Sequence, residues 1–250
     1  EADTNEELRR KLNELAKQYP TLREGEYREK LLSLFRERGL DINAEQLDKV
    51  KEEVAPYTTD VLTYTCDVSD EAAVNAAVAD AMQHFGRIDV LINNAAIWRT
   101  WKTFMAVTTE EWKKFIDINV MGVVYCTRAV LGSMIEHHYG RIVNVGSVAG
   151  IYGNGHMSHY SATKGAIISL TAALAKEVAK DGVLVNCVSP GTVSSSKDAD
   201  MDAYTSCELC YMERSGTDNE NANLICFMAS DEATYISGQN FQIDGCRKKI

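Results

Sequence analysis

The 250-residue chain has few positive charges, no long apolar run and no second pair of closely spaced cysteines, and each absence excludes a class of protein. Its 26 lysines and arginines are outnumbered by 36 aspartates and glutamates, which gives a net charge of −10 and argues against a nucleic-acid-binding surface. No apolar run reaches the ~18 residues of a membrane span, and the acidic start at Glu1 does not resemble a signal peptide. We therefore expect a soluble, cytoplasmic protein.

The cysteine pattern gives no strong indication of a metal. Seven cysteines, an odd number in a chain without a secretory signal, favour reduced thiols. Cys207 and Cys210 have the spacing of half a zinc site or of a redox pair. A structural zinc needs four ligands, and no second pair has ligand spacing, so we favour structural or incidental cysteines and predict no metal.

What the chain does contain is an alternation of apolar, β-branched runs with helical patterns, which predicts a parallel α/β sheet. The strands are predicted over residues 61–66, 88–92, 141–145, 183–188 and 240–243. The helices between them are predicted over residues 71–84, 109–137, 160–179 and 218–228. No internal repeat or low-complexity tract interrupts the pattern.

Tyr160 and Lys164 are the residues whose spacing carries the clearest chemistry. They are four positions apart in a segment with helical spacing, so the phenol and the ammonium lie on one face. A free tyrosine titrates near pH ~10, and a fixed positive charge lowers that pKa. The buried strand that begins near Gly140 delivers Ser147 at its carboxyl end, where the hydroxyl can hold a substrate oxygen near the phenol. The pattern predicts general acid catalysis at the carboxyl ends of the strands, although a Tyr-x-x-x-Lys pair alone also occurs on solvated helix faces.

Between Thr63 and Asp244, the order of short motifs resembles the classical short-chain dehydrogenase/reductase family. The motifs are Cys66-Asp-Val68, Asn93-Asn-Ala-Ala96, Asn119, Ser147, Tyr160, Lys164, Pro190-Gly191, Ser237-Gly-Gln and Ile243-Asp-Gly245. The resemblance implies an α/β fold with a doubly wound, Rossmann-like parallel sheet in three α/β/α layers. Residues 21–250 would form this single domain, and residues 1–20 a helical N-terminal extension.

The family's site residues can be carried over to matching positions. Tyr160 would donate or accept the proton, Ser147 would orient the carbonyl or alcohol, Lys164 would lower the tyrosine pKa and hold the nicotinamide ribose, and Asn119 would anchor a water. The cofactor, NAD(H) in preference to NADP(H), would contact Tyr160, Lys164 and a further set at the strand ends: Asp67, Val68, Asn94, Ala95, Pro190, Gly191, Thr192 and Val193. Asp67 could instead serve at a helix N-terminus, Asn94 in a turn, and Asn119 as a core residue with a structural hydrogen bond.

The first third of the chain departs from the family. A dinucleotide-binding sheet begins with a strand and a Gly-rich turn, yet Gly25 and Gly39 are isolated and residues 6–18, 28–38 and 43–54 read as amphipathic helices. Residues 28–39 and 43–54 resemble the first two helices of the family. We therefore hypothesise that two segments are missing from the printed chain, near 27/28 and 42/43. The alternative is a protein that has lost its pyrophosphate-binding turn.

The substrate pocket is expected to be apolar. Trp98, Tyr152, His156 and Met157, together with Ser147, would bind the substrate, although aromatic residues at strand ends also pack cores and subunit contacts. The whole chain is most similar to a bacterial 20β-hydroxysteroid dehydrogenase, which implies an NAD(H)-dependent reaction on a steroid side-chain ketone such as that of cortisol. Reduction of a 3-oxoacyl thioester or a polyol, and a non-catalytic scaffold, remain alternatives. The resemblance also implies a homotetramer with an interface on residues 109–137 and 160–179.

Overall fold

The computed structural model describes residues 51, 52, 54–56, 58, 60–98, 100–194 and 206–248. The chain divides into two compact units, residues 1–65 and residues 66–250, and each is described by itself. In the first unit, Lys51, Glu52 and Val54 are helical, in agreement with the predicted helix over 43–54. The predicted extension over 1–20, the helices over 6–18 and 28–38, and both junctions lie outside the described residues and stay predictions.

The second unit is built on a parallel sheet of four strands in the order in which they occur along the chain. The strands are β1 (Val90–Asn93), β2 (Gly140–Val145), β3 (Val183–Pro190) and β4 (Asn240–Ile243). The register pairs Asn93 with Asn144, Asn144 with Cys187, and Pro190 with Ile243. The carboxyl ends of the strands therefore meet at one edge of the sheet.

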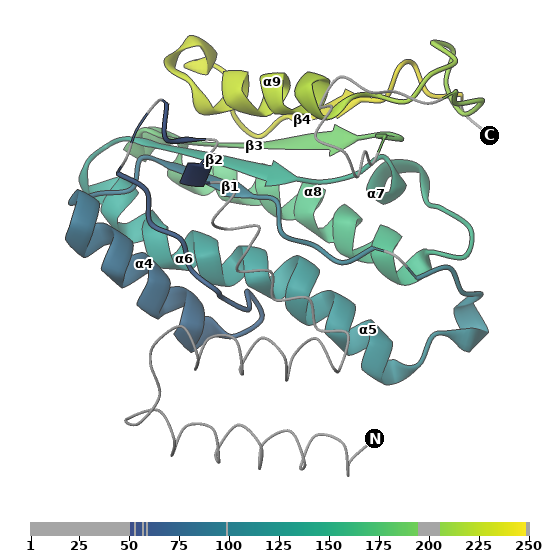
Figure 1. Ribbon diagram of the computed structural model, residues 1–250, viewed down its shortest axis with the longest axis horizontal. Helices are drawn as coiled ribbons and strands as arrows, with labels where there is room; N and C mark the ends of the chain where they lie inside the picture. Colours follow the sequence, from purple (N-terminus) through teal and green to yellow (C-terminus); the bar gives the residue numbers. More distant parts are fainter. Residues whose placement is uncertain are drawn as a thin grey trace. The chain divides into compact units, whose positions relative to one another are not determined.

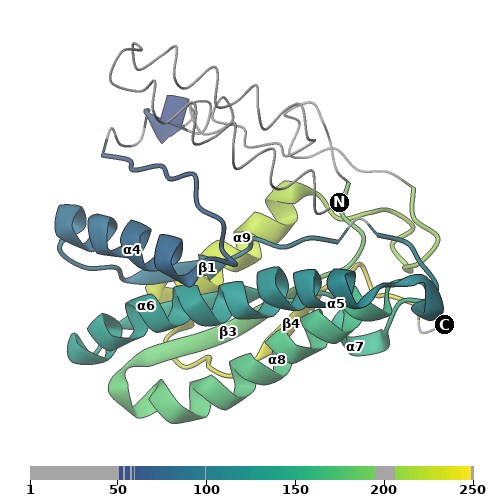
Figure 2. The ribbon, with the colours of Figure 1, turned by 90° about the horizontal axis from the view of Figure 1, so that it is seen from below.

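Helices cover both faces of this sheet, which gives the three expected layers (Figure 1). One face carries α4 (Glu71–Phe85), α5 (Thr109–Ile116), α6 (Gly122–Glu136) and α8 (Ser158–Val178), and the other carries α9 (Asp218–Ala229), as Figure 2 also shows. Adjacent residues of β2 serve opposite faces: Ile142 belongs to the core under α6 and α8, and Val143 packs with Met228 of α9. This alternation is the period of a strand buried on both sides.

Polar side chains begin the helices at defined residues. Asp70 accepts hydrogen bonds from the backbone N–H groups of Ala72 and Ala73 at the start of α4. Thr108 and Thr217 start α5 and α9 with reciprocal capping boxes, in which Glu111 and Glu220 bond back to the threonine N–H. These caps satisfy N–H groups that have no partner within the helix.

The predicted elements were found with small shifts at their ends, apart from one strand. Residues 61–66 form no strand, although the segment has the composition of one. A strand exists only when a neighbour takes its hydrogen bonds, and within the described part of the chain β1 pairs with β2 alone. The predicted helix over 109–137 is interrupted by a π-helical turn, η3 (Asp117–Met121), and the short helix α7 (Ala149–Tyr152) was not predicted.

The stretch Thr109–Glu136 is long and apolar enough, by length and composition alone, to cross a membrane. Two of its side chains, Val130 and Met134, are each 1% exposed and pack on β2 and β3 in the core of the α/β unit. The expectation that the chain has no membrane span stays a prediction.

Candidate active site

Ser147 is positioned by the chain that leaves β2. The Gly146 N–H donates to the carbonyl of Val188 at 2.8 Å, and the Val148 N–H donates to that of Pro190 at 3.1 Å, so the segment stays against β3 beyond the end of the strand. A Cβ at Gly146 would lie 2.6 Å from the Ser189 hydroxyl and 2.7 Å from the Cys187 sulfur, which makes glycine necessary there. Ser147 is 9% exposed, and its hydroxyl accepts a hydrogen bond from the Ala149 N–H at 3.1 Å.

Tyr160 and Lys164 lie on the first turns of α8, as the spacing predicts. The Lys164 ammonium is 5.9 Å from the centroid of the Tyr160 ring and donates a 2.7 Å hydrogen bond to the Val145 carbonyl. Lys164 is only 4% exposed. The lysine thus ties α8 to the end of β2 beside Ser147, and the three predicted catalytic residues come together at the carboxyl edge of the sheet.

The protonation states at this site follow from burial. Burial raises the pKa of the Tyr160 phenol, and a hydrogen bond from the Ser147 hydroxyl opposes that shift. Burial lowers the pKa of Lys164 to about 8, so its amine is charged at neutral pH. The Lys164 ammonium bonds the Val145 carbonyl and lies 5.9 Å from the centre of the Tyr160 ring. The lowering of the tyrosine pKa by Lys164 stays a prediction.

Asn119 occupies the middle of the π-helical turn between α5 and α6, and it is 1% exposed. Its amide donates to the Ile97 carbonyl at 3.0 Å and to the Thr163 hydroxyl at 3.1 Å, and its oxygen accepts from the Ile97 N–H at 2.8 Å. Asn119 thereby joins the segment after β1 to the helix that carries Tyr160 and Lys164. This is the structural hydrogen-bonding role that the sequence left open; the anchoring of a water stays a prediction.

The residues expected at a cofactor fall into two groups. Pro190 ends β3 beside β4, and Gly191, Thr192 and Val193 follow it. A Cβ at Gly191 would lie 2.9 Å from the Asp244 Cα, so the chain is tightly held there. Asn94 and Ala95 follow β1 and are exposed. Thr192 and Lys164 both lie at the carboxyl ends of the strands, where nucleotides bind in open α/β sheets.

Asp67 and Val68 have local roles in the described structure. The Asp67 carboxylate accepts from the Ser69 N–H at 2.9 Å and from its hydroxyl at 2.7 Å, which is turn chemistry just before α4. Val68 packs against Gly122 of α6, where a Cβ would come within 2.8 Å of the valine methyl group. Contact of either residue with a cofactor stays a prediction.

These residues fit the nicotinamide end of a dinucleotide. An ammonium has three N–H donors, and within the part of the chain that the structure describes the Val145 carbonyl takes one, so Lys164 has donors left for the ribose hydroxyls. Tyr160, Ser147 and the segment after β3 surround the same edge of the sheet. A Gly-rich turn for the pyrophosphate is absent from the described residues, as the sequence leads one to expect.

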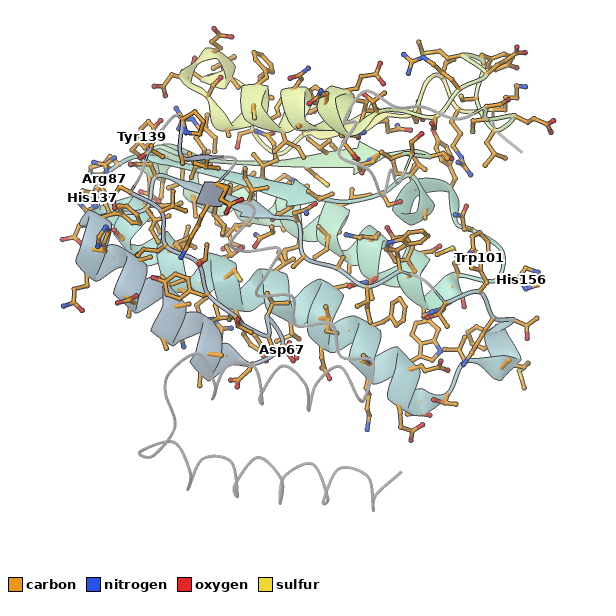
Figure 3. All side chains as sticks on the ribbon, in the orientation of Figure 1. Asp67, Arg87, Trp101, His137, Tyr139 and His156 are labelled. Carbon is orange, nitrogen blue, oxygen red and sulfur yellow. The ribbon has the colours of Figure 1, made fainter. Side chains whose placement is uncertain are left out.

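The expected substrate residues are not equally accessible. Trp98 is 45% exposed and lines a cleft of about 520 Å³ with Ala96, Ile97, Thr100, Glu111, Lys114 and Phe115. Tyr152 is exposed, but its hydroxyl donates to Gln242 at 2.7 Å. His156 lies on a loop at the same end of the unit as Trp101 (Figure 3), and its carbonyl accepts from the Lys102 N–H at 2.8 Å. Met157 is 3% exposed and therefore belongs to the buried part of the unit.

Sequence reasoning missed His159, which directly precedes Tyr160. It is fully buried, and neither ring nitrogen has a hydrogen-bond partner among the described residues. The imidazole packs edge-on against Phe115 at 4.2 Å and Trp112 at 6.0 Å, and burial lowers its pKa. No spacing or motif signals this role, because the aromatic partners come from α5, more than forty residues earlier in the chain.

A buried polar chain across the sheet was also missed. Asn93 donates to the Asn144 oxygen at 2.8 Å, Asn144 donates to the Thr171 hydroxyl at 2.9 Å, and Thr171 donates to the Ile167 carbonyl at 2.8 Å. It connects β1, β2 and α8 beneath the active site. The pairing of asparagines at matching positions of two predicted parallel strands was the available signal.

Comparison with known proteins decides the family. A family model described as Enoyl-(Acyl carrier protein) reductase matches residues 38–246. The 3-oxoacyl-(acyl-carrier-protein) reductase FabG of Thermotoga maritima is 38% identical over 208 residues, which are 82% of this chain and 84% of that protein. The chain belongs to the classical short-chain dehydrogenase/reductase family. It is therefore an oxidoreductase that uses a nicotinamide cofactor.

Other members of the family differ in substrate and cofactor. The 2-dehydro-3-deoxy-L-rhamnonate dehydrogenase (NAD(+)) of a Sphingomonas species is 38% identical over 187 residues, 72% of this chain and 74% of that protein. Among solved structures, ElxO with NADP bound has a TM-score of 0.73 at 30% identity, covering 81% of this chain and 84% of that one. Xylitol dehydrogenase with NAD⁺ bound has a TM-score of 0.74 at 30% identity, covering 82% and 86%. The fold and the family are thus shown, and the substrate and the choice between NAD and NADP are not.

Proposed function

We propose that this dehydrogenase/reductase interconverts a ketone and a secondary alcohol, with Tyr160 exchanging the proton. The observation that carries the proposal is the meeting of two segments at the carboxyl edge of the sheet: Ser147 follows β2, and α8 brings Tyr160 and Lys164, whose ammonium bonds the Val145 carbonyl and lies 5.9 Å from the Tyr160 ring centre. A nicotinamide cofactor supplies the hydride when bound. Ser147 orients the substrate oxygen, and the phenol donates its proton to the oxygen as the carbonyl is reduced.

For the substrate we favour a 3-oxoacyl thioester, because relatives named as 3-oxoacyl-(acyl-carrier-protein) reductases in Thermotoga maritima and Staphylococcus aureus cover 80–82% of the chain at 36–38% identity. The wall of the cleft beside Trp98 is partly apolar and could take the acyl chain. The net charge of −10 offers little of the basic surface that an acidic carrier protein would need. A coenzyme A thioester presents the same 3-oxoacyl group without a carrier protein, so it is the first probe.

A bulky apolar ketone, such as the side-chain ketone of a steroid, is the second candidate. It is supported by aromatic side chains that remain exposed near the site: Trp98 is 45%, Trp101 65% and Phe104 64% exposed. Single exposed apolar residues are common, but a group of large aromatic ones at a cleft favours a rigid apolar ligand.

One assay separates these substrates. Oxidation of NADH and of NADPH is followed with acetoacetyl-coenzyme A, cortisol and xylulose at equal concentrations. We expect the highest kcat/KM with acetoacetyl-coenzyme A, and with NADH in preference to NADPH. A higher value with cortisol would select the steroid, and oxidation with neither cofactor and none of the three would contradict the proposed reaction.

The assembly proposed is a homotetramer. Before the last turn of α8, which exposes Lys176 and Glu177, the exposed residues of the helix are all small and helically spaced, Ala162, Ala166, Ser169 and Ala173, which allow a second helix to approach closely. We propose that this surface packs against the same face of α8 in a second copy of the chain.

A further inference from the structure

A turn after the active-site strand carries two buried cysteines. Ser206 and Arg214 form an isolated antiparallel bridge, and the Cys207 N–H donates to the Glu213 carbonyl at 3.0 Å, which closes the turn. Cys207 is 8% exposed and Cys210 is 4% exposed. The Cys-x-x-Cys spacing therefore brings two thiols together in one ordered turn.

The surroundings of Cys207 favour its thiolate. Burial alone would raise the pKa, but the Leu209 N–H, the Thr192 hydroxyl, the Cys210 thiol and the charge of Arg247 together lower it. The Cys210 thiol also donates to the Arg214 carbonyl at 3.1 Å. Cys207 thus has the features of an attacking thiol, and Cys210 those of a resolving thiol at its side.

A metal does not explain the pair. Across the residues that the structure describes, no group of three or more histidines, cysteines, aspartates or glutamates is placed to hold an ion. A small polar cavity of about 10 Å³ adjoins both thiols and is lined by Thr192, Cys207, Leu209, Cys210, Arg214, Asp244 and Arg247. That volume corresponds to about one water molecule, so it suits an oxidant of similar size and excludes bulky disulfides.

We propose that Cys207 and Cys210 are a redox modification site at which hydrogen peroxide forms a reversible intramolecular disulfide. The Cys207 thiolate attacks one peroxide oxygen, the O–O bond breaks, and the leaving hydroxide takes a proton to become water. Cys207 is then a sulfenic acid. The Cys210 sulfur attacks the Cys207 sulfur, the S–O bond breaks, and hydroxide leaves with the Cys210 proton as a second water. A dithiol reductant reverses the bond by thiol exchange.

The turn is joined directly to the strand ends of the active site. The Gly216 N–H donates to the Thr192 carbonyl at 2.8 Å, and the Tyr211 and Met212 N–H groups donate to the carbonyls of Cys246 and Gly245 just after β4. Oxidation removes the thiolate that the Thr192 hydroxyl bonds. We expect the KM for NADH to rise several-fold in the oxidised protein. This last consequence rests on the proposed function, whereas the disulfide does not.

The test uses the full chain, reduced and freed of reductant, with millimolar hydrogen peroxide. Remaining thiols are then alkylated, and peptides are identified by mass spectrometry. We expect the 207–210 peptide to lose the mass of two hydrogens and to regain it with dithiothreitol. In oxidised Cys210→Ser, unfolding in the presence of dimedone, which gives the reagent access to the buried residue, should label Cys207 as a sulfenic acid. The matched control is Cys226→Ser, which removes an exposed cysteine on α9 and should leave the 207–210 bond unchanged.

Oxidation confined to the exposed Cys226 and Cys246, a bond between Cys210 and Cys246, or a Cys207 that resists dimedone in Cys210→Ser would each overturn the proposal. A protein that forms the 207–210 bond but binds no nicotinamide in either state would leave the redox site standing and remove the proposed reaction. The two failures are therefore distinguishable.

Discussion

Lys164 is a predicted catalytic residue whose burial lowers the stability of the folded protein while the amine is charged. It is 4% exposed, and burial lowers its pKa to about 8, against 10.5 for a free lysine. The unfolded chain therefore binds more protons than the folded protein between these two values. In that interval the free energy of unfolding rises with pH, and below about pH 8 the folded protein bears the full cost of the buried charge.

We predict that Lys164→Met inactivates the enzyme and changes the pH dependence of its stability. Relative to the variant, the wild-type protein should gain unfolding free energy from pH 7 to pH 10, by up to about 3 kcal/mol. Loss of the hydrogen bond to the Val145 carbonyl lowers the unfolding free energy of Lys164→Met by an amount that does not depend on pH. Urea unfolding at several pH values measures the difference, and parallel stability curves would contradict a buried, titrating lysine.

Some site residues could be predicted from the sequence and others could not. Ser147, Tyr160 and Lys164 were predictable because one strand and one helix place them, so spacing along the chain reports their proximity. His159 was not, since its environment is made by aromatic residues of α5. Spacing puts a lysine near the Tyr160 ring, whereas the bond from its ammonium to the Val145 carbonyl is a tertiary contact that spacing does not report.

At the scale of elements, the contact between α7 and α8 holds the site together. A Cβ on Gly150 of α7 would lie 2.6 Å from the Gly165 nitrogen and 2.6 Å from the Lys164 carbonyl carbon. Backbone atoms cannot move aside as a flexible side chain does. Glycine at 150 therefore sets the distance between the segment that carries Ser147 and the helix that carries Lys164.

Gly150→Ala should destabilise the protein by about 1–3 kcal/mol and lower kcat, because α7 must move away from α8. Gly132→Ala is the matched control. Gly132 lies in α6 with nothing within 4 Å of an added Cβ, and alanine there should stabilise by about 0.5–1 kcal/mol. Thermal unfolding and steady-state kinetics of both variants check the pair. Equal effects of the two changes would show that the α7–α8 contact does not position the site.

Elements were predicted where local periodicity and tertiary contacts agree. The strands β2 and β3 are apolar runs that the fold buries, and the predicted ends of β2, β3 and β4 were nearly right. Residues 61–66 have the same composition but no described partner strand, and the prediction of a strand was wrong. The π-helical turn at Asp117–Met121 was unpredictable from periodicity, because a one-residue insertion depends on the bonds that Asn119 makes to Ile97 and Thr163.

At the scale of the whole molecule, the exposed small residues of α8 predict its assembly. Ala166→Arg should dissociate the proposed tetramer, because a long cation replaces a methyl group where two helices approach. Ala76→Arg, at an exposed alanine of α4, is the control and should leave the assembly intact. Sedimentation or light scattering gives the mass. A wild-type monomer, or a tetramer that survives Ala166→Arg, would contradict the placement of the interface.

The sequence of the first 60 residues leads to a prediction about the affinity of the chain for NADH. Their sequence contains no Gly-rich turn of the kind that gathers backbone N–H groups at a pyrophosphate. For the 250-residue chain we therefore expect NADH to bind no more than about tenfold more tightly than reduced nicotinamide mononucleotide. Fluorescence titration of both compares the two halves of the dinucleotide. A preference of about a thousandfold for NADH would show that residues 1–60 supply a pyrophosphate site of another kind.

The most direct test of the proposed reaction is the Tyr160→Phe variant, assayed for turnover and for NADH binding. The change removes one oxygen from a half-buried ring, so the fold and the ammonium of Lys164 are kept. Tyr139→Phe is the control, because that hydroxyl bonds Asp231 at the opposite end of the unit from Trp101 and His156 (Figure 3). We predict that Tyr160→Phe lowers kcat by about 10²–10⁴-fold with unchanged NADH affinity, and that Tyr139→Phe leaves both unchanged. Turnover by Tyr160→Phe within a few-fold of wild type would contradict the assignment of Tyr160 as the proton donor.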